Sequence, residues 1–102
     1  MLNFDLGLKD FDEYQVEKID IHAIGDGGRG VQYIFEFENE YGASVIKRPG
    51  SYGYDQDLWE LAVLDRDGEL TFTTPITDDV LGYLSVNDVR KALTEIKEMK
   101  ND

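Results

Sequence analysis

The chain has no cysteine, one histidine and two prolines among its 102 residues. The absence of cysteine excludes disulfides and thiolate metal sites, and it favours a reducing cytosol. Because His22 is the only histidine, a metal site would consist mainly of carboxylates, which suits only weak magnesium-type binding. No apolar run approaches the roughly 18 residues of a transmembrane helix, and the acidic first residues lack the features of a secretory signal. We therefore expect no metal, no cofactor and no membrane association.

Catalytic motifs are missing as well, including G-x-S-x-G, H-E-x-x-H and the Walker A sequence. Residues 25–30, GDGGRG, match G-x-G-x-x-G literally, but the dinucleotide fingerprint requires a helix next, and residues 31–38 alternate as a strand does. Residues 65–69 resemble part of a calcium loop, yet Val63 stands where an oxygen ligand is needed. The sequence therefore predicts a protein that is not an enzyme, since no convergent polar pocket can be predicted from it.

Acidic residues dominate what is present. Twenty-two acids against ten bases give a net charge of −12, and residues 86–102 carry four of each, so the whole excess lies in residues 1–85. Such a surface repels phosphate backbones, which argues against direct nucleic-acid binding. It attracts a basic protein surface at long range, with a salt-sensitive association rate. The alternative is that the acidity only keeps the protein in solution.

Residues 59–74 give the clearest local signal, a β-hairpin around the tight-turn pair Asp67-Gly68. The first arm is apolar on both faces, which predicts a central strand covered on both sides. The second arm alternates, with Leu70 and Phe72 on one face.

Alternation also predicts strands over residues 14–24, 31–38 and 43–47, and a short edge strand over residues 2–6. Residues 77–84 are expected to hold one helical turn. Ser85 begins the best helix, because apolar residues recur at spacings of three and four and Asp88 completes a variant capping box. The expected fold is one α+β domain over residues 1–102, an antiparallel sheet of four to six strands with one C-terminal helix packed on one face.

The loop before the hairpin is rich in aromatic residues. Tyr52 and Tyr54, close to Trp59, resemble a protein-contact hot spot, in which aromatic rings supply rigid contact area. The alternative is that Trp59 belongs to the core and the tyrosines cover the edge of the sheet.

Four blocks of sequence resemble a family of small hypothetical proteins of tailed bacteriophages. The blocks are YGASV (41–45), GSYG (50–53), WELAVL (59–64) and TPITDDVLGYL (74–84), and the likeness extends over roughly residues 33–98. The resemblance implies a phage or prophage origin and a location in the host bacterial cytoplasm. It implies no activity.

Two functions follow as hypotheses. In the first, the protein inhibits a host nucleic-acid-binding or defence protein, of the anti-CRISPR or anti-restriction type, by presenting carboxylates in place of phosphates. The acids expected to do so are Asp10, Asp12, Glu13, Glu17, Glu36, Glu38, Asp55 and Asp57. In the second, it is a phage accessory, assembly or structural module that binds through a sheet edge or through the Tyr52/Tyr54 loop. An exposed edge strand would also permit homodimerisation.

Overall fold

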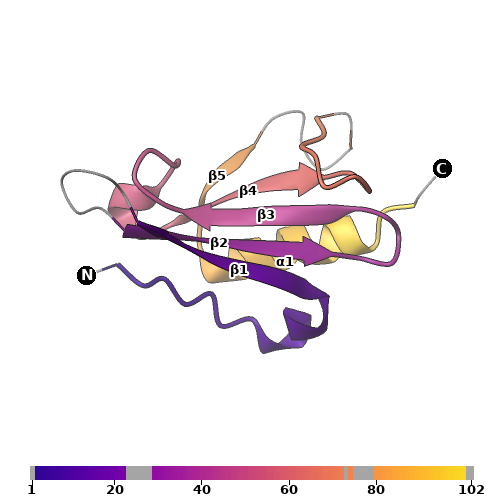
Figure 1. Cartoon of the computed structure of the whole chain (residues 1–102), viewed down its shortest axis with the longest axis horizontal. Helices are drawn as coiled ribbons and strands as arrows, with labels where there is room; N and C mark the ends of the chain where they lie inside the picture. The colour runs from indigo at the N-terminus through magenta and orange to yellow at the C-terminus, as the bar shows by residue number, and fades with distance from the viewer. Residues whose placement is uncertain (1, 23–28, 73, 75–79, 101–102) are drawn as a thin grey trace.

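The protein is an antiparallel sheet of five strands with one C-terminal helix, as expected for an α+β fold. The computed structural model describes residues 2–22, 29–72, 74 and 80–100. The strands are β1 (Gln15–His22), β2 (Arg29–Glu36), β3 (Gly42–Lys47), β4 (Trp59–Leu64) and β5 (Leu81–Leu84). They lie side by side in chain order, each antiparallel to the next (Figure 1). This order places β1 and β5 at the two edges.

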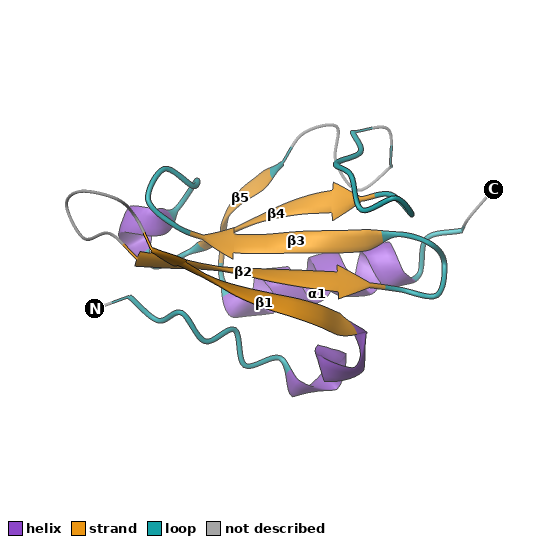
Figure 2. Ribbon diagram, viewed as in Figure 1, coloured by secondary structure: helices purple, strands orange, loops and turns teal. Residues whose placement is uncertain are grey.

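The helix α1 (Val86–Lys97) covers one face of the sheet, where it packs on β3, β4 and β5 (Figure 2). Its buried residues are those of the predicted apolar stripe, Val89, Ala92, Leu93 and Ile96. They belong to one core with alternate residues of the central strands, among them Val31, Tyr33, Phe35, Val45, Leu61 and Val63. We call this the helix-covered face and the opposite side the open face. The predicted helix and its packing are confirmed.

The segment before β1 is not the predicted edge strand. Residues 2–8 form no strand, and residues Lys9–Tyr14 form a 3₁₀ helix, η1. Leu6 and Leu8 are buried in the core, and the Tyr33 hydroxyl accepts from the Leu6 N–H (3.3 Å) and donates to the Phe4 carbonyl (3.0 Å). A side chain thus bonds the backbone groups that a strand ladder would have used.

The hairpin turn forms as predicted, but its second arm is only one bridge long. The Asp65 N–H donates to the Glu69 carbonyl at 2.8 Å, and Gly68 adopts φ 79°. Beyond the turn, Leu64 and Leu70 make the one bridge among the described residues, and the Thr71 N–H donates to the Val63 carbonyl at 2.9 Å. The Leu70 and Phe72 side chains are 53% and 45% exposed. The rest of that edge of β4 pairs with β5, so the second arm has no room to continue.

Residues 81–84 are a strand and not part of a helical turn. Leu81 and Leu84 pair with Leu61 and Trp59 of β4. A single helical turn is unstable on its own, so pairing with a formed strand decides the conformation here. The remaining residues of that prediction, 77–79, lie outside the described residues.

Strand β1 has an unexpected orientation. Lys18 pairs with Tyr33, and its ammonium lies 5.7 Å from the centre of that ring, so the polar side of β1 lies on the helix-covered face. Ile19, on the open face, is 36% exposed. Residues 25–28 of the GDGGRG segment lie outside the described residues, and its last two residues, Arg29 and Gly30, begin β2 two positions before the predicted start at Val31.

Candidate functional site: an acidic groove and an aromatic pocket

The structure divides the ten predicted contact residues between the two ends of the sheet. Asp10, Asp12 and Glu13 lie in η1, Glu17 in β1, Glu36 in β2 and Glu38 in the β2–β3 turn. Tyr52, Tyr54, Asp55 and Asp57 lie in the β3–β4 connection, around the short 3₁₀ helix η2 (Tyr54–Gln56). Figure 1 shows η1 and the β2–β3 turn at one end of the molecule and η2 at the other. The acids therefore do not form one continuous surface.

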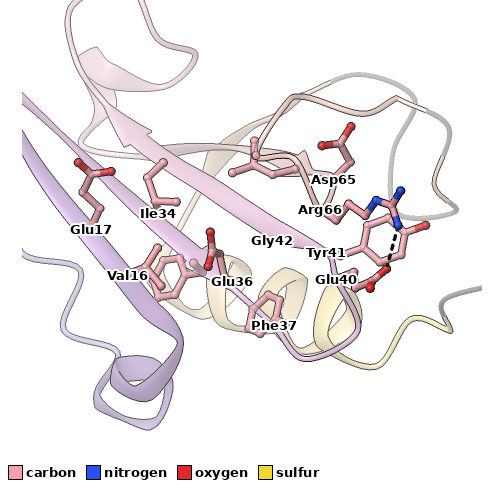
Figure 3. A pocket seen from close by; sticks show the side chains of 13 residues that line it. Val16, Glu17, Ile34, Glu36, Phe37, Glu40, Tyr41, Gly42, Asp65 and Arg66 are labelled. Atoms are coloured by element: carbon pink, nitrogen blue, oxygen red, sulfur yellow. Dashed lines mark ion pairs between the residues drawn. The ribbon is translucent and has the colours of Figure 1, made fainter.

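The first end carries a shallow groove with a volume of about 360 Å³, which we call the acidic groove. Its floor is apolar, with Val16 and Ile34 between the acids, and Val16 is 53% exposed. The ionisable residues that line it are Glu17, Glu36, Glu40, Asp65 and Arg66. Figure 3 shows Glu17 and Glu36 over the neighbouring strands β1 and β2, with Glu40, Asp65 and Arg66 on the far side.

Strand register explains why the groove is there. Glu17 pairs with Ile34, and Glu36 pairs with Gly42 on the other side of β2. Gly42 has no side chain, so the sheet surface beside Glu36 is not filled. A Cβ at this position would collide with the Phe35 carbonyl, which makes glycine a requirement of the sheet.

Two of the groove carboxylates have no ionic partner in the described part of the chain. The Glu17 and Glu36 side chains make no hydrogen bond or ion pair with any described residue. Glu40 and Arg66 face each other at 4.0 Å, and Asp65 accepts from the N–H groups of the turn that follows it. The groove therefore keeps a net negative charge.

A long basic side chain fits this combination of features. The aliphatic stem of lysine or arginine packs on apolar surface while its charged head reaches a carboxylate. Charge-assisted hydrogen bonds of this kind are stronger than neutral ones. The acidic groove is therefore suited to a basic segment of another protein.

At the other end of the sheet, Trp59 and the loop tyrosines have different roles. Trp59 is buried, which confirms the alternative that this residue belongs to the core. Tyr52 is 56% exposed and stacks on the equally exposed Tyr83, with ring centroids 6.4 Å apart and planes 27° from parallel. Sequence analysis missed Tyr83, because its contact with Tyr52 depends on the pairing of β5 with β4. A spacing of 31 residues gives no local signal for that contact.

Asp57 differs from the other predicted acids because it is bonded within the protein. It accepts from the Lys47 ammonium at 2.7 Å and from the Asn3 N–H at 2.7 Å. The hydrogen bond from Lys47, followed by that from Asn3, holds the pKa of Asp57 below its ordinary value. Asp57 therefore stabilises the architecture of the loop, and its role as a contact residue stays a prediction.

Comparisons with known proteins add no relative. No family model matches the chain, and no curated protein or solved structure matches it either. Within residues 2–22, 29–72, 74 and 80–100, no three His, Asp or Glu side chains are grouped to hold a metal ion. No helix in the same residues has the length and apolar character to cross a membrane.

Proposed function

We propose that this protein binds a basic surface of another protein through its acidic groove. We further propose that the target is a host nucleic-acid-binding or defence protein, which is inhibited because its basic surface is occupied. The observation that carries the proposal is the pair Glu17 and Glu36, two carboxylates without ionic partners among the described residues, above an apolar floor.

Two further features support this proposal. The net charge of −12 gives a long-range attraction for a basic partner and repels nucleic acid. The acids of η1 lie at the same end, and the Asp10 carboxylate makes an exposed ion pair with Arg90 at 3.4 Å. Exposed pairs of this kind contribute little to stability, so Asp10 can exchange Arg90 for a partner's cation at small cost.

The test is capture from a bacterial lysate at low salt, followed by elution with a salt gradient and identification of the eluted proteins. The groove variant Glu17→Gln/Glu36→Gln is compared with Glu95→Gln/Glu98→Gln, which removes the same charge from exposed positions of α1 and its C-terminus. We expect nucleic-acid enzymes to elute at moderate salt from the wild type and from the control. We expect the groove variant to bind them about tenfold more weakly.

Two results would overturn the proposal. Equal loss of binding in the groove and control variants would show that only net charge matters. Capture of virion proteins alone, or of nothing, would leave the acidity with a solubilising role.

The alternative function is an interaction module without inhibitory activity. It is favoured by the exposed Tyr52–Tyr83 pair, which lies at the opposite end from the groove. Homodimerisation through an edge strand also stays a prediction. It is checked by comparing the solution mass with that of the 11.6 kDa chain.

A further inference from the structure

A second pocket lies at the η2 end of the sheet, with a volume of about 170 Å³. We call it the tyrosine pocket, because Tyr52, Tyr54 and Tyr83 line it together with Asp55. Three aromatic rings and a carboxylate make a different kind of surface from the acidic groove.

The rings are held in place by the backbone. The Tyr83 N–H donates to the Tyr52 carbonyl at 3.3 Å, and Tyr83 adopts φ 57°, which non-glycine residues rarely do. Gly82 lies so close to Tyr52 that a Cβ there would come within 2.5 Å of the Tyr52 Cβ. The Tyr54 hydroxyl donates to the Arg29 carbonyl at 3.1 Å, which fixes the third ring.

The strained backbone of Tyr83 suggests a functional role for its exposed ring. A residue in the left-handed region costs free energy, and such residues concentrate at binding and catalytic sites. The Tyr83 side chain recovers little of that cost by burial, since it is 56% exposed. Asparagine or glycine would adopt this backbone conformation more easily.

The charge of the pocket selects a cation. The Asp55 side chain is exposed and makes no hydrogen bond or ion pair with any described residue. An apolar ligand would remove water from this carboxylate without compensation, and an anion would be repelled. Aromatic faces attract cations, most often arginine.

We propose that the tyrosine pocket binds an arginine side chain of a partner protein. A guanidinium group is planar, so it can lie flat on a tyrosine ring while its N–H groups reach a carboxylate, and an ammonium group cannot do both equally well. This inference does not depend on the proposed inhibitory function, because the pocket and the acidic groove lie at opposite ends of the sheet.

The experiment is an NMR titration of the full chain with the tripeptide acetyl-Gly-Arg-Gly-amide. Two matched peptides replace arginine with lysine or with citrulline, which has nearly the shape of arginine without its charge. We expect saturable shifts of the Tyr52 and Tyr83 ring signals with a Kd in the millimolar range, about fivefold weaker binding of lysine, and no saturation with citrulline.

Variants locate the interaction. Tyr83→Asn removes the ring and tolerates the left-handed backbone, and Tyr52→Leu keeps an apolar side chain without a ring. Each should weaken arginine binding by about fivefold or more, as should Asp55→Asn, whereas Tyr52→Phe should bind within about twofold of the wild type. Far-UV circular dichroism confirms that each variant is folded.

The control variant Glu95→Gln/Glu98→Gln, which lacks two exposed charges of α1 and its C-terminus, should give the same Kd from the Tyr52 and Tyr83 ring signals as the wild type does. Equal binding of the citrulline peptide, unchanged binding by Tyr52→Leu, or peptide-induced shifts confined to the acidic groove would each overturn the inference. Failure of lysate capture with a positive peptide titration would reject the inhibitor proposal and leave the tyrosine pocket standing.

Discussion

The Lys47 ammonium lies 2.7 Å from the Asp57 carboxylate and 4.2 Å from the centre of the Trp59 ring, with its side chain only 2% exposed. It also donates to the Asn3 carbonyl at 2.7 Å. One buried cation thus joins the N-terminal segment, the end of β3, the η2 loop and the core tryptophan. The cost of removing it from water is offset because each of these contacts is to an acceptor or an aromatic face.

The two partners of this ion pair should differ in their contribution to stability. Asp57→Asn leaves a buried ammonium without a counter-charge, whereas Lys47→Met leaves a carboxylate that is 40% exposed and can be hydrated. We expect a loss of roughly 2 kcal/mol for Asp57→Asn, below the range of about 3–5 kcal/mol for fully buried pairs, and about 1 kcal/mol for Lys47→Met. Urea unfolding at pH 7 measures both, and an equal or reversed order would contradict the assignment. Asparagine is chosen because Asp57 adopts φ 61°.

The same pair predicts a pH dependence. The pKa of Asp57 is lowered in the folded protein, chiefly by the hydrogen bond from Lys47. A lowered pKa adds stability above the unfolded-state pKa, which is about 4, and that stability is lost as the pH falls through the folded-state pKa. We expect the contribution of Asp57 to the free energy of unfolding to be constant from pH 7 to pH 5 and to decrease below about pH 4. The fall should be shallower in Asp57→Asn, and identical slopes would argue against this role.

Asn39 should anchor the end of α1 to the sheet. Its side-chain amide donates to the carbonyls of Ile96 (2.7 Å), Lys97 (3.2 Å) and Met99 (2.9 Å) from the β2–β3 turn. Asn39→Ala should cost about 1–2 kcal/mol in the free energy of unfolding, because helix-end carbonyls lose their donor. Asn39→Asp should cost more at pH 7, since it places a negative charge at the negative end of the helix dipole. Chemical denaturation of both variants tests the order, and a milder effect of aspartate would refute it.

The capping box at the start of α1 gives a further prediction. The Ser85 hydroxyl accepts from the Asp88 N–H, and the Asp88 carboxylate accepts from the Ser85 N–H, each at 3.1 Å. The hydrogen bond from the Ser85 N–H to the Asp88 carboxylate, followed by that from the Ser85 side chain, lowers the pKa of Asp88. Ser85→Ala should destabilise the protein by about 1 kcal/mol, and Ser85→Thr should restore most of it. The double variant Ser85→Ala/Asp88→Ala should lose less unfolding free energy than the sum of the losses of the two single variants. Strict additivity of the losses would exclude a reciprocal capping box.

Several features could be predicted from local sequence because local physics decides them. The helix after Ser85 follows from its cap and its apolar spacing, and the tight turn at Gly68 follows from a residue that accepts a positive φ. Alternation identified β2, and apolar residues on both faces of residues 59–64 identified the burial of β4. Each of these signals depends on residues within a few positions of one another.

Other features could not be predicted because they depend on distant residues. Residues 2–6 alternate as an edge strand does, yet the Tyr33 hydroxyl is hydrogen-bonded to the backbone of Phe4 and Leu6, and Leu6 and Leu8 are buried in the core. Residues 81–84 became a strand because part of the β4 edge was available to them. The candidate sites show the same limit, since the sequence does not distinguish Asp57 from the other acids, and its bond to Lys47 depends on tertiary packing.

The sequence by itself determined the fold class, the helix and its cap, and the acidic character of the surface, because composition and short-range periodicity carry that information. Only the tertiary structure decided which acids meet. Strand register brought Glu17 and Glu36 to one groove, buried Lys47 formed an ion pair with Asp57, and the β4–β5 pairing placed Tyr83 on Tyr52. The reason is that a contact between residues far apart in the chain is fixed by the packing of whole elements, which no local pattern encodes.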